Sequence, residues 1–102
     1  MSDYTKFDEP VAHPGEHLRE DYLPAFGLTP DALAECMGLK DHSRVLRLVH
    51  EAAPVTPDMS LRLARVFGTN PDFWLTLQSR HDLSKAAIAH RAELAKIKTL
   101  AA

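Results

Sequence analysis

The hydrophobic positions near the middle of the chain repeat with the three-to-four-residue spacing of two short amphipathic helices. The first is predicted over about 30–37, because Thr29 can cap it, Pro30 suits its first turn and Gly38 can end it. The second is predicted over about 42–50, with these apolar side chains facing inward: Val45, Leu48 and Val49. Two short helices joined by a tight turn are typical of a helix-turn-helix, whose second helix enters the DNA major groove.

Further helices are predicted on both sides of this unit. His13-Pro14-Gly15-Glu16 opens a helix that Pro24 and Gly27 end. Thr56-Pro57-Asp58 and Asn70-Pro71-Asp72 repeat the pattern of cap, proline and acid, and so mark two more helix starts. The apolar positions expected to be buried on these two helices are Met59, Leu61, Leu63, Ala64 and Phe67, then Phe73, Trp74, Leu75 and Leu77. With a last helix over about 84–100 and no strand pattern, the sequence predicts an all-α bundle of five or six helices.

Three segments follow from this pattern. Residues 1–12 have no clear period and are expected to form an N-terminal arm. Residues 13–83 form the helix-turn-helix DNA-binding domain, and residues 84–102 form a C-terminal helix expected to serve dimerisation.

Composition and charge fit one small globular domain. The 102 residues are 45% hydrophobic and 25% charged, and the net charge of −2 does not by itself suggest a nucleic-acid binder. The distribution is uneven, since residues 1–35 carry eight acids and two bases, whereas residues 80–102 carry five bases and two acids. One face could therefore suit DNA and the acidic front a basic protein, although single charges more often belong to solvated helix faces.

The single cysteine, Cys36, excludes an internal disulfide and a thiolate metal cluster. Because free cysteine usually behaves as a small hydrophobe, we expect Cys36 to be a buried or half-buried structural thiol. The chain has no basic segment followed by an apolar run and no apolar stretch of membrane-spanning length. We therefore expect a cytoplasmic protein with no membrane association.

One short motif suggests different chemistry. His13-Pro14-Gly15-Glu16-His17 matches the H-x-x-E-H signature of inverted zinc peptidases. That site needs both histidines on one face of an established helix, whereas Pro14-Gly15 places His13 at or before the helix start. No phosphate loop or nucleophile–base pair stands out elsewhere, so we expect no metal, no cofactor and no enzymatic activity.

A series of motifs resembles the HigA family of antitoxins. These motifs are His13-Pro14-Gly15-Glu16, Leu18-Arg19-Glu20, Leu33-Ala34 with Gly38, Val55-Thr56-Pro57-Asp58-Met59, Leu61-Arg62-Leu63-Ala64 and the run from Phe67 to Gln78. The resemblance covers about residues 13–83 and implies a Cro/repressor-type helix-turn-helix in a homodimer that binds double-stranded operator DNA. It also implies a partner, a HigB-type toxin with a RelE-like fold that cleaves mRNA, which the antitoxin neutralises while repressing its own operon.

The predicted recognition segment departs from the family pattern. The start of its second helix, Lys40-Asp41-His42-Ser43-Arg44, is one residue longer than usual, and its end, His50-Glu51-Ala52-Ala53, lacks the usual glycine and base. The residues carried over as base contacts are His42, Ser43 and Arg47, those carried over as phosphate contacts are Thr29, Lys40 and Arg44, and His50 lies on the same face.

Two protein surfaces complete the hypothesis. The acidic side chains expected to face the toxin are Asp8, Glu9, Glu16, Glu20 and Asp21. The side chains expected at the dimer interface are Trp74, Leu77, Ala87, Leu94 and Ile97. Two alternatives stay open: a stand-alone helix-turn-helix regulator without a toxin, and an antitoxin whose DNA binding is weakened by the altered segment.

Overall fold

The computed structural model describes residues 7–100, in which every regular element is helical. The elements are α1 (Pro14–His17), η2 (Leu18–Tyr22), α2 (Leu23–Phe26), α3 (Pro30–Cys36), α4 (Ser43–Val49), α5 (Pro57–Phe67), α6 (Phe73–Ala89) and α7 (Arg91–Ala95). Since α1, η2 and α2 are contiguous, these residues form six helical segments, which confirms the predicted all-α bundle. Residues 1–6 of the predicted arm and residues 101–102 lie outside the described part.

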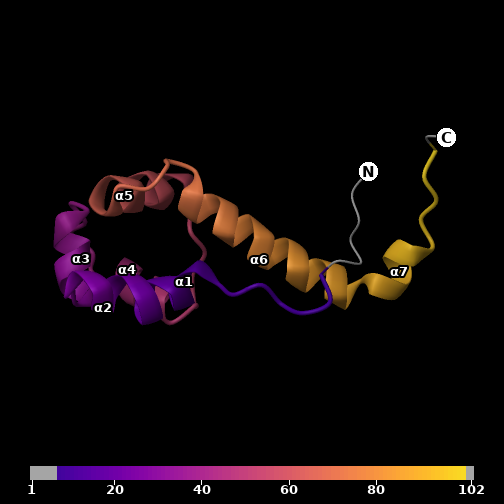
Figure 1. Cartoon of the computed structure of the whole chain (residues 1–102), viewed down its shortest axis with the longest axis horizontal. Helices are drawn as coiled ribbons and strands as arrows, with labels where there is room; N and C mark the ends of the chain where they lie inside the picture. Colours follow the sequence, from indigo (N-terminus) through magenta and orange to yellow (C-terminus); the bar gives the residue numbers. More distant parts are fainter. Residues whose placement is uncertain (1–6, 101–102) are drawn as a thin grey trace.

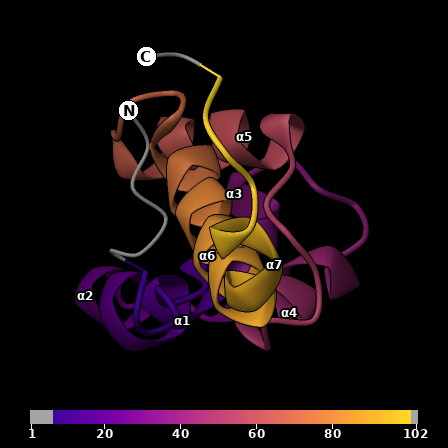
Figure 2. The same cartoon turned by 90° about the vertical axis from the view of Figure 1, so that its right-hand side faces the viewer.

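The molecule has a rounded head and a protruding helix. Helices α1–α5 and the start of α6 form the head, from which α6 extends outward and ends at α7 (Figure 1). The overall extents are 51 × 23 × 22 Å. Viewed along the long axis, α6 leaves the head between the side formed by α1 and α2 and the side formed by α5 (Figure 2).

Local capping explains two of the predicted helix starts and fails at the third. The hydroxyl oxygens of Thr29 and Thr56 accept hydrogen bonds from backbone N–H groups three residues later, at 3.1 and 3.2 Å. The start predicted at Asn70 is wrong, because α6 begins only at Phe73 and Asp72 makes no side-chain capping bond. A hydroxyl from α5, that of Ser60, accepts the hydrogen bond from the Leu75 backbone N–H instead, at 3.1 Å.

The first helix contains a wide turn that the sequence pattern did not predict. Residues 18–22 form a π-helical turn, in which the Leu23 N–H bonds to the Leu18 carbonyl. Pro24 follows at once, and proline has no N–H and crowds the carbonyl four residues earlier. The wider turn relieves that conflict, so Pro24 stays within the last helical turn and Gly27, at φ 62°, ends the segment.

The hydrophobic core joins the first four helical segments and the start of α6. Its most deeply buried side chains are Leu18, Leu33, Ala34, Val45, Leu48, Leu63 and Trp74. Two predictions are corrected here. Leu61 is 55% exposed on α5, where Ser60 is buried in its place, and Cys36 is exposed at the end of α3.

The C-terminal region differs from the single helix predicted over 84–100. Helix α6 crosses the proposed boundary between Leu83 and Ser84 without a break and ends at Ala89, and the short α7 follows. Val11 ties the N-terminal segment to α6, because its N–H donates to the Ser84 hydroxyl and its carbonyl accepts from the His81 ring, at 2.9 and 2.7 Å. Within the part of the chain that the structure describes, none of the helices combines the length and apolar character needed to span a bilayer.

Candidate nucleic-acid interface

Helices α3 and α4 form the predicted helix-turn-helix. Helix α3 ends in a Schellman motif, with Gly38 at φ 72° and hydrogen bonds from the Gly38 N–H to the Glu35 carbonyl and from the Leu39 N–H to the Ala34 carbonyl, at 3.0 and 2.9 Å. Leu39 then turns back into the core. The chain therefore changes direction between α3 and α4 within a few residues, as the sequence pattern predicted.

The start of α4 is organised by Asp41. Its carboxylate accepts hydrogen bonds from the Ser43 backbone N–H and hydroxyl, at 3.0 and 2.5 Å. These bonds favour the charged form and hold the pKa of the Asp41 carboxyl below its usual range. Asp41 thus supplies the side-chain acceptor at the start of α4, one residue before the N-cap His42, which makes no side-chain capping bond of its own.

The outward face of α4 carries the candidate base-reading side chains. Arg47 is exposed, and its guanidinium donates to the Ser43 hydroxyl at 3.1 Å. His42 lies at the turn, with its Nδ1 atom 3.3 Å from the Asp31 carboxylate on α3. His50, at the other end of α4, is exposed. The structure therefore brings Ser43, Arg47 and His50 onto one helix and places His42 at its edge.

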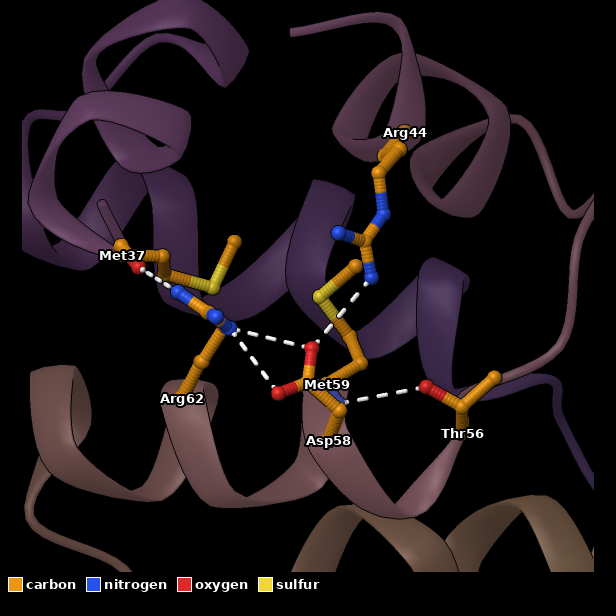
Figure 3. Close-up of polar contacts among 6 residues, drawn as sticks. All are labelled: Met37, Arg44, Thr56, Asp58, Met59 and Arg62. Carbon is orange, nitrogen blue, oxygen red and sulfur yellow. Dashed lines mark hydrogen bonds and ion pairs between the residues drawn. The ribbon is translucent and has the colours of Figure 1, made fainter. Parts of the chain in front are cut away.

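The candidate phosphate contacts divide into two groups. Thr29 and Lys40 are exposed at the start of α3 and in the turn before α4. Arg44, in contrast, points toward α5, where its guanidinium lies 3.4 Å from the Asp58 carboxylate (Figure 3). Arg62, one helical turn further along α5, donates to the same carboxylate at 3.0 Å. The Arg62 guanidinium holds the pKa of the Asp58 carboxyl below its usual range.

The inner side of α4 is fixed by the first helix. Gly15 packs so closely that a Cβ atom at this position would lie 2.0 Å from the Leu48 carbonyl oxygen. Arg19 donates to the Val49 carbonyl at 2.5 Å and pairs with the Glu51 carboxylate at 3.2 Å. The Arg19 bond gives a partner to a carbonyl group at the end of α4, and the close packing of Gly15 fixes the distance between α4 and the first helix. The sequence pattern did not identify them, because the partners of Arg19 lie 30 and 32 residues away along the chain.

The acidic residues predicted to face a toxin do not form one surface. Glu16, Glu20 and Asp21 are exposed on the first helix. The N-terminal segment runs from that helix along α6 to α7, where the Asp8 carboxylate lies 3.6 Å from Arg91 (Figure 1). Asp8 and the neighbouring Glu9 are therefore separated from the other three acids.

The predicted dimer residues also differ in accessibility. Trp74 is 0% exposed and makes edge-to-face contacts with Tyr22 and Phe73, so it is a core residue and is not available to a partner. Ala87 is buried as well. The remaining candidates have accessible surface: Leu77 and Leu94 are half-buried, and Ile97 is exposed.

The histidines of the H-x-x-E-H motif have separate partners. The His13 Nδ1 atom accepts a hydrogen bond from the Gly15 N–H at 2.9 Å, and its ring packs edge-on against His81. His17 lies 3.5 Å from the Asp21 carboxylate on the surface. Among residues 7–100, no group of three or more histidine, cysteine or acidic side chains is placed to hold a metal ion.

Known proteins resemble this chain in sequence and in fold. No protein-family model matches the chain. Virulence-associated protein I of Dichelobacter nodosus is 42% identical over 81 residues, which cover 79% of this chain and 74% of that protein. Antitoxin HigA-1 of Vibrio cholerae is 31% identical over 86 residues, which cover 84% of this chain and 80% of that protein.

A solved structure extends the agreement to three dimensions. The Pseudomonas aeruginosa antitoxin HigA, solved with the higBA promoter, has a TM-score of 0.81 and 35% identity to this chain. The match covers 88% of this chain and 98% of that one, so it includes the helix-turn-helix and most of the surrounding helices. Because sequence and fold agree over most of both proteins, the chain belongs to the HigA family of antitoxins, which are helix-turn-helix DNA-binding proteins.

Proposed function

We propose that this chain is the antitoxin of a type II toxin–antitoxin pair and represses its own operon by binding operator DNA through α4. The observation that supports this proposal most directly is the outward face of α4, where Arg47 and His50 are exposed and Ser43 is half-buried, on a helix-turn-helix similar to one solved with the higBA promoter. The protein acts by stoichiometric binding in the cytoplasm, without catalysis. Its partner is a HigB-type mRNA-cleaving toxin.

We assign recognition of the DNA sequence to the outward face of α4. Arg47 can release the Ser43 hydroxyl and donate to a guanine edge, and Ser43 and His42 lie beside it at the start of the helix. We assign phosphate contacts to Thr29 and Lys40, which are both exposed; such contacts position the protein without reading the DNA sequence. A pair of subunits then contacts two half-sites about one helical turn, or a multiple of it, apart.

A salt titration on the operator fragment tests this assignment. Arg47→Ala should weaken operator binding by about 1–3 kcal/mol and relax specificity at one position of each half-site. Arg65→Ala, which removes an exposed arginine from the last turn of α5, is the matched control and should bind like the wild type. Wild-type affinity of a folded Arg47→Ala protein would mean that this face of α4 does not read DNA.

Dimerisation is assigned to the C-terminal part of the chain, where Leu94 and Ile97 offer apolar surface. A chain ending at Ala89, the last residue of α6, keeps the head and α6 and lacks α7. We expect this shortened chain to sediment as a monomer at micromolar concentration. A stable dimer of the shortened chain would remove α7 from the interface.

Toxin binding is assigned to the acids that share the first helix. Reversing Glu16, Glu20 and Asp21 to lysine should slow association with the toxin several-fold and flatten its salt dependence, because rim charges mainly set the association rate. The partner to test is a small basic protein of about one domain, if one is encoded next to this chain. If no neighbouring product binds the wild-type chain, the stand-alone regulator is the better description.

A further inference from the structure

Three side chains from two helices meet beside the helix-turn-helix. Asp58 lies in the first turn of α5, and both of its carboxylate oxygens accept from Arg62 Nε, at 3.2 and 3.0 Å. One of these oxygens also lies 3.4 Å from a guanidinium nitrogen of Arg44 on α4. Figure 3 shows the carboxylate between the two arginines. A single negative charge thus holds two positive ones.

Arg62 extends this cluster to α3. Its second guanidinium nitrogen donates to the Met37 carbonyl at 2.7 Å, at the C-terminal end of α3 (Figure 3). Carbonyls in the last turn of a helix have no partner within the helix, so this donor satisfies one of them. Helix α5 therefore contacts both helices of the helix-turn-helix through one Asp58–Arg62 pair. Its hold on α3 is independent of Arg44.

The position of Arg44 distinguishes it from Arg47. Both side chains line a recess with Thr56 and Met59 at the start of α5, but the Arg44 guanidinium contacts a carboxylate, whereas the Arg47 guanidinium donates to the Ser43 hydroxyl. A carboxylate offers a guanidinium the same kind of charged oxygen as a phosphate. While Asp58 occupies Arg44, a DNA phosphate must displace the carboxylate to gain that contact.

We propose that Asp58 is a specificity-determining positioning residue, which holds Arg44 against α5 and thereby withholds it from the DNA backbone. This inference rests on the proposed DNA binding by α4. Phosphate contacts are independent of sequence, so withholding one cation from each subunit lowers non-specific binding and leaves base reading by Arg47 unchanged. The retained Arg62 contact keeps α3 in place when Arg44 is altered.

Salt dependence of binding to a non-operator duplex measures the effect. Each neutralised phosphate contributes about 0.9 to the slope of log K against log salt, so freeing Arg44 in both subunits steepens the slope by about 1.8. Asp58→Asn should show this change and bind the non-operator duplex several-fold more tightly at low salt. Asp72→Asn, which also removes one exposed acid from the surface, is the control for net charge and should leave the slope unchanged.

A double-mutant cycle tests whether the gain passes through Arg44. In an Arg44→Ala background, Asp58→Asn should leave both the slope and the non-specific affinity unchanged. The proposal is overturned if Asp58→Asn does not steepen the slope, or if the gain persists without Arg44.

If the Asp58 variant does not fold, the salt dependence of Arg44→Ala alone tests the proposal. With Arg44 held by Asp58, this variant should keep the wild-type slope; a slope shallower by about 1.8 would show that Arg44 already neutralises phosphates, and would overturn the proposal. Failure of the proposed function is distinct from these outcomes, because in that case the wild-type chain itself would not bind the operator.

Discussion

Replacing Gly15 with alanine tests how α4 is held in the head. A Cβ atom at this position would lie 2.0 Å from the Leu48 carbonyl oxygen, 3.0 Å from the Leu48 carbonyl carbon and 3.1 Å from His13 Nδ1. Since Cβ contacts under 3.0 Å are essentially not observed, α1 and α4 must separate by about 1 Å. The two nearest atoms belong to the Leu48 backbone, so no side-chain rotation can relieve the closest contacts.

Two effects of opposite sign decide how much Gly15→Ala changes the free energy of unfolding. Overpacking typically costs about 1–3 kcal/mol of unfolding free energy, and a 2.0 Å contact with backbone lies at the upper end of that range, whereas alanine in place of glycine favours a helix by up to about 1 kcal/mol. The clash wins, so Gly15→Ala should lose about 2 kcal/mol of stability, which corresponds to a drop of at least about 8 °C in Tm. The displaced α4 carries Arg47, so the folded variant should also bind operator DNA more weakly.

Thermal and urea unfolding followed by circular dichroism give the measurement. Gly68→Ala is the matched control, because a Cβ there meets nothing within 4 Å and only the positive φ of 72° opposes it. That control should lose about 1 kcal/mol, the cost of a left-handed conformation for alanine. A Gly15→Ala protein as stable as the wild type, or more stable, would refute the close packing of α1 on Leu48, since helix propensity alone predicts that result.

Two further predictions concern buried polar groups. Burial and the nearby His81 lower the pKa of His13 below its ordinary value of 6.5. Between these two pKa values, His13 binds a proton in the unfolded chain and stays neutral in the folded chain. His13 should therefore not affect stability above pH 6.5, and the free energy of unfolding should fall as the pH drops from 6.5 toward the lowered pKa. In His13→Asn, whose side chain can still accept from the Gly15 N–H, the free energy of unfolding measured with urea should fall less between pH 7 and 5. Ser60→Ala should lower the free energy of unfolding by about 1–3 kcal/mol in the same assay, because the Ser60 hydroxyl donates to the Pro71 carbonyl at 2.7 Å and accepts from the Leu75 N–H in the first turn of α6. An unchanged unfolding midpoint would mean that water replaces the hydroxyl.

Short-range signals were sufficient for most of the fold. The caps at Thr29 and Thr56 and the glycine at the end of α3 act over three to five residues, so the sequence pattern alone predicts these helix limits. The alternation of apolar positions likewise predicts that Val45 and Leu48 face inward. The capping hydrogen bonds have the same partners in any packing of the helices, and the sequence therefore determines them by itself.

Tertiary packing decided the features that depend on partners far along the chain. The start of α6 is set by Ser60 of the preceding helix, so the local cap predicted at Asn70 is not used. The direction of Arg44 is set by Asp58, fourteen residues away, which turns a predicted phosphate contact toward the protein itself. The close approach of Gly15 to α4 exists only once two helices pack. Periodicity identifies the inward face of a helix, but the identity of the group it meets is a property of the assembled head.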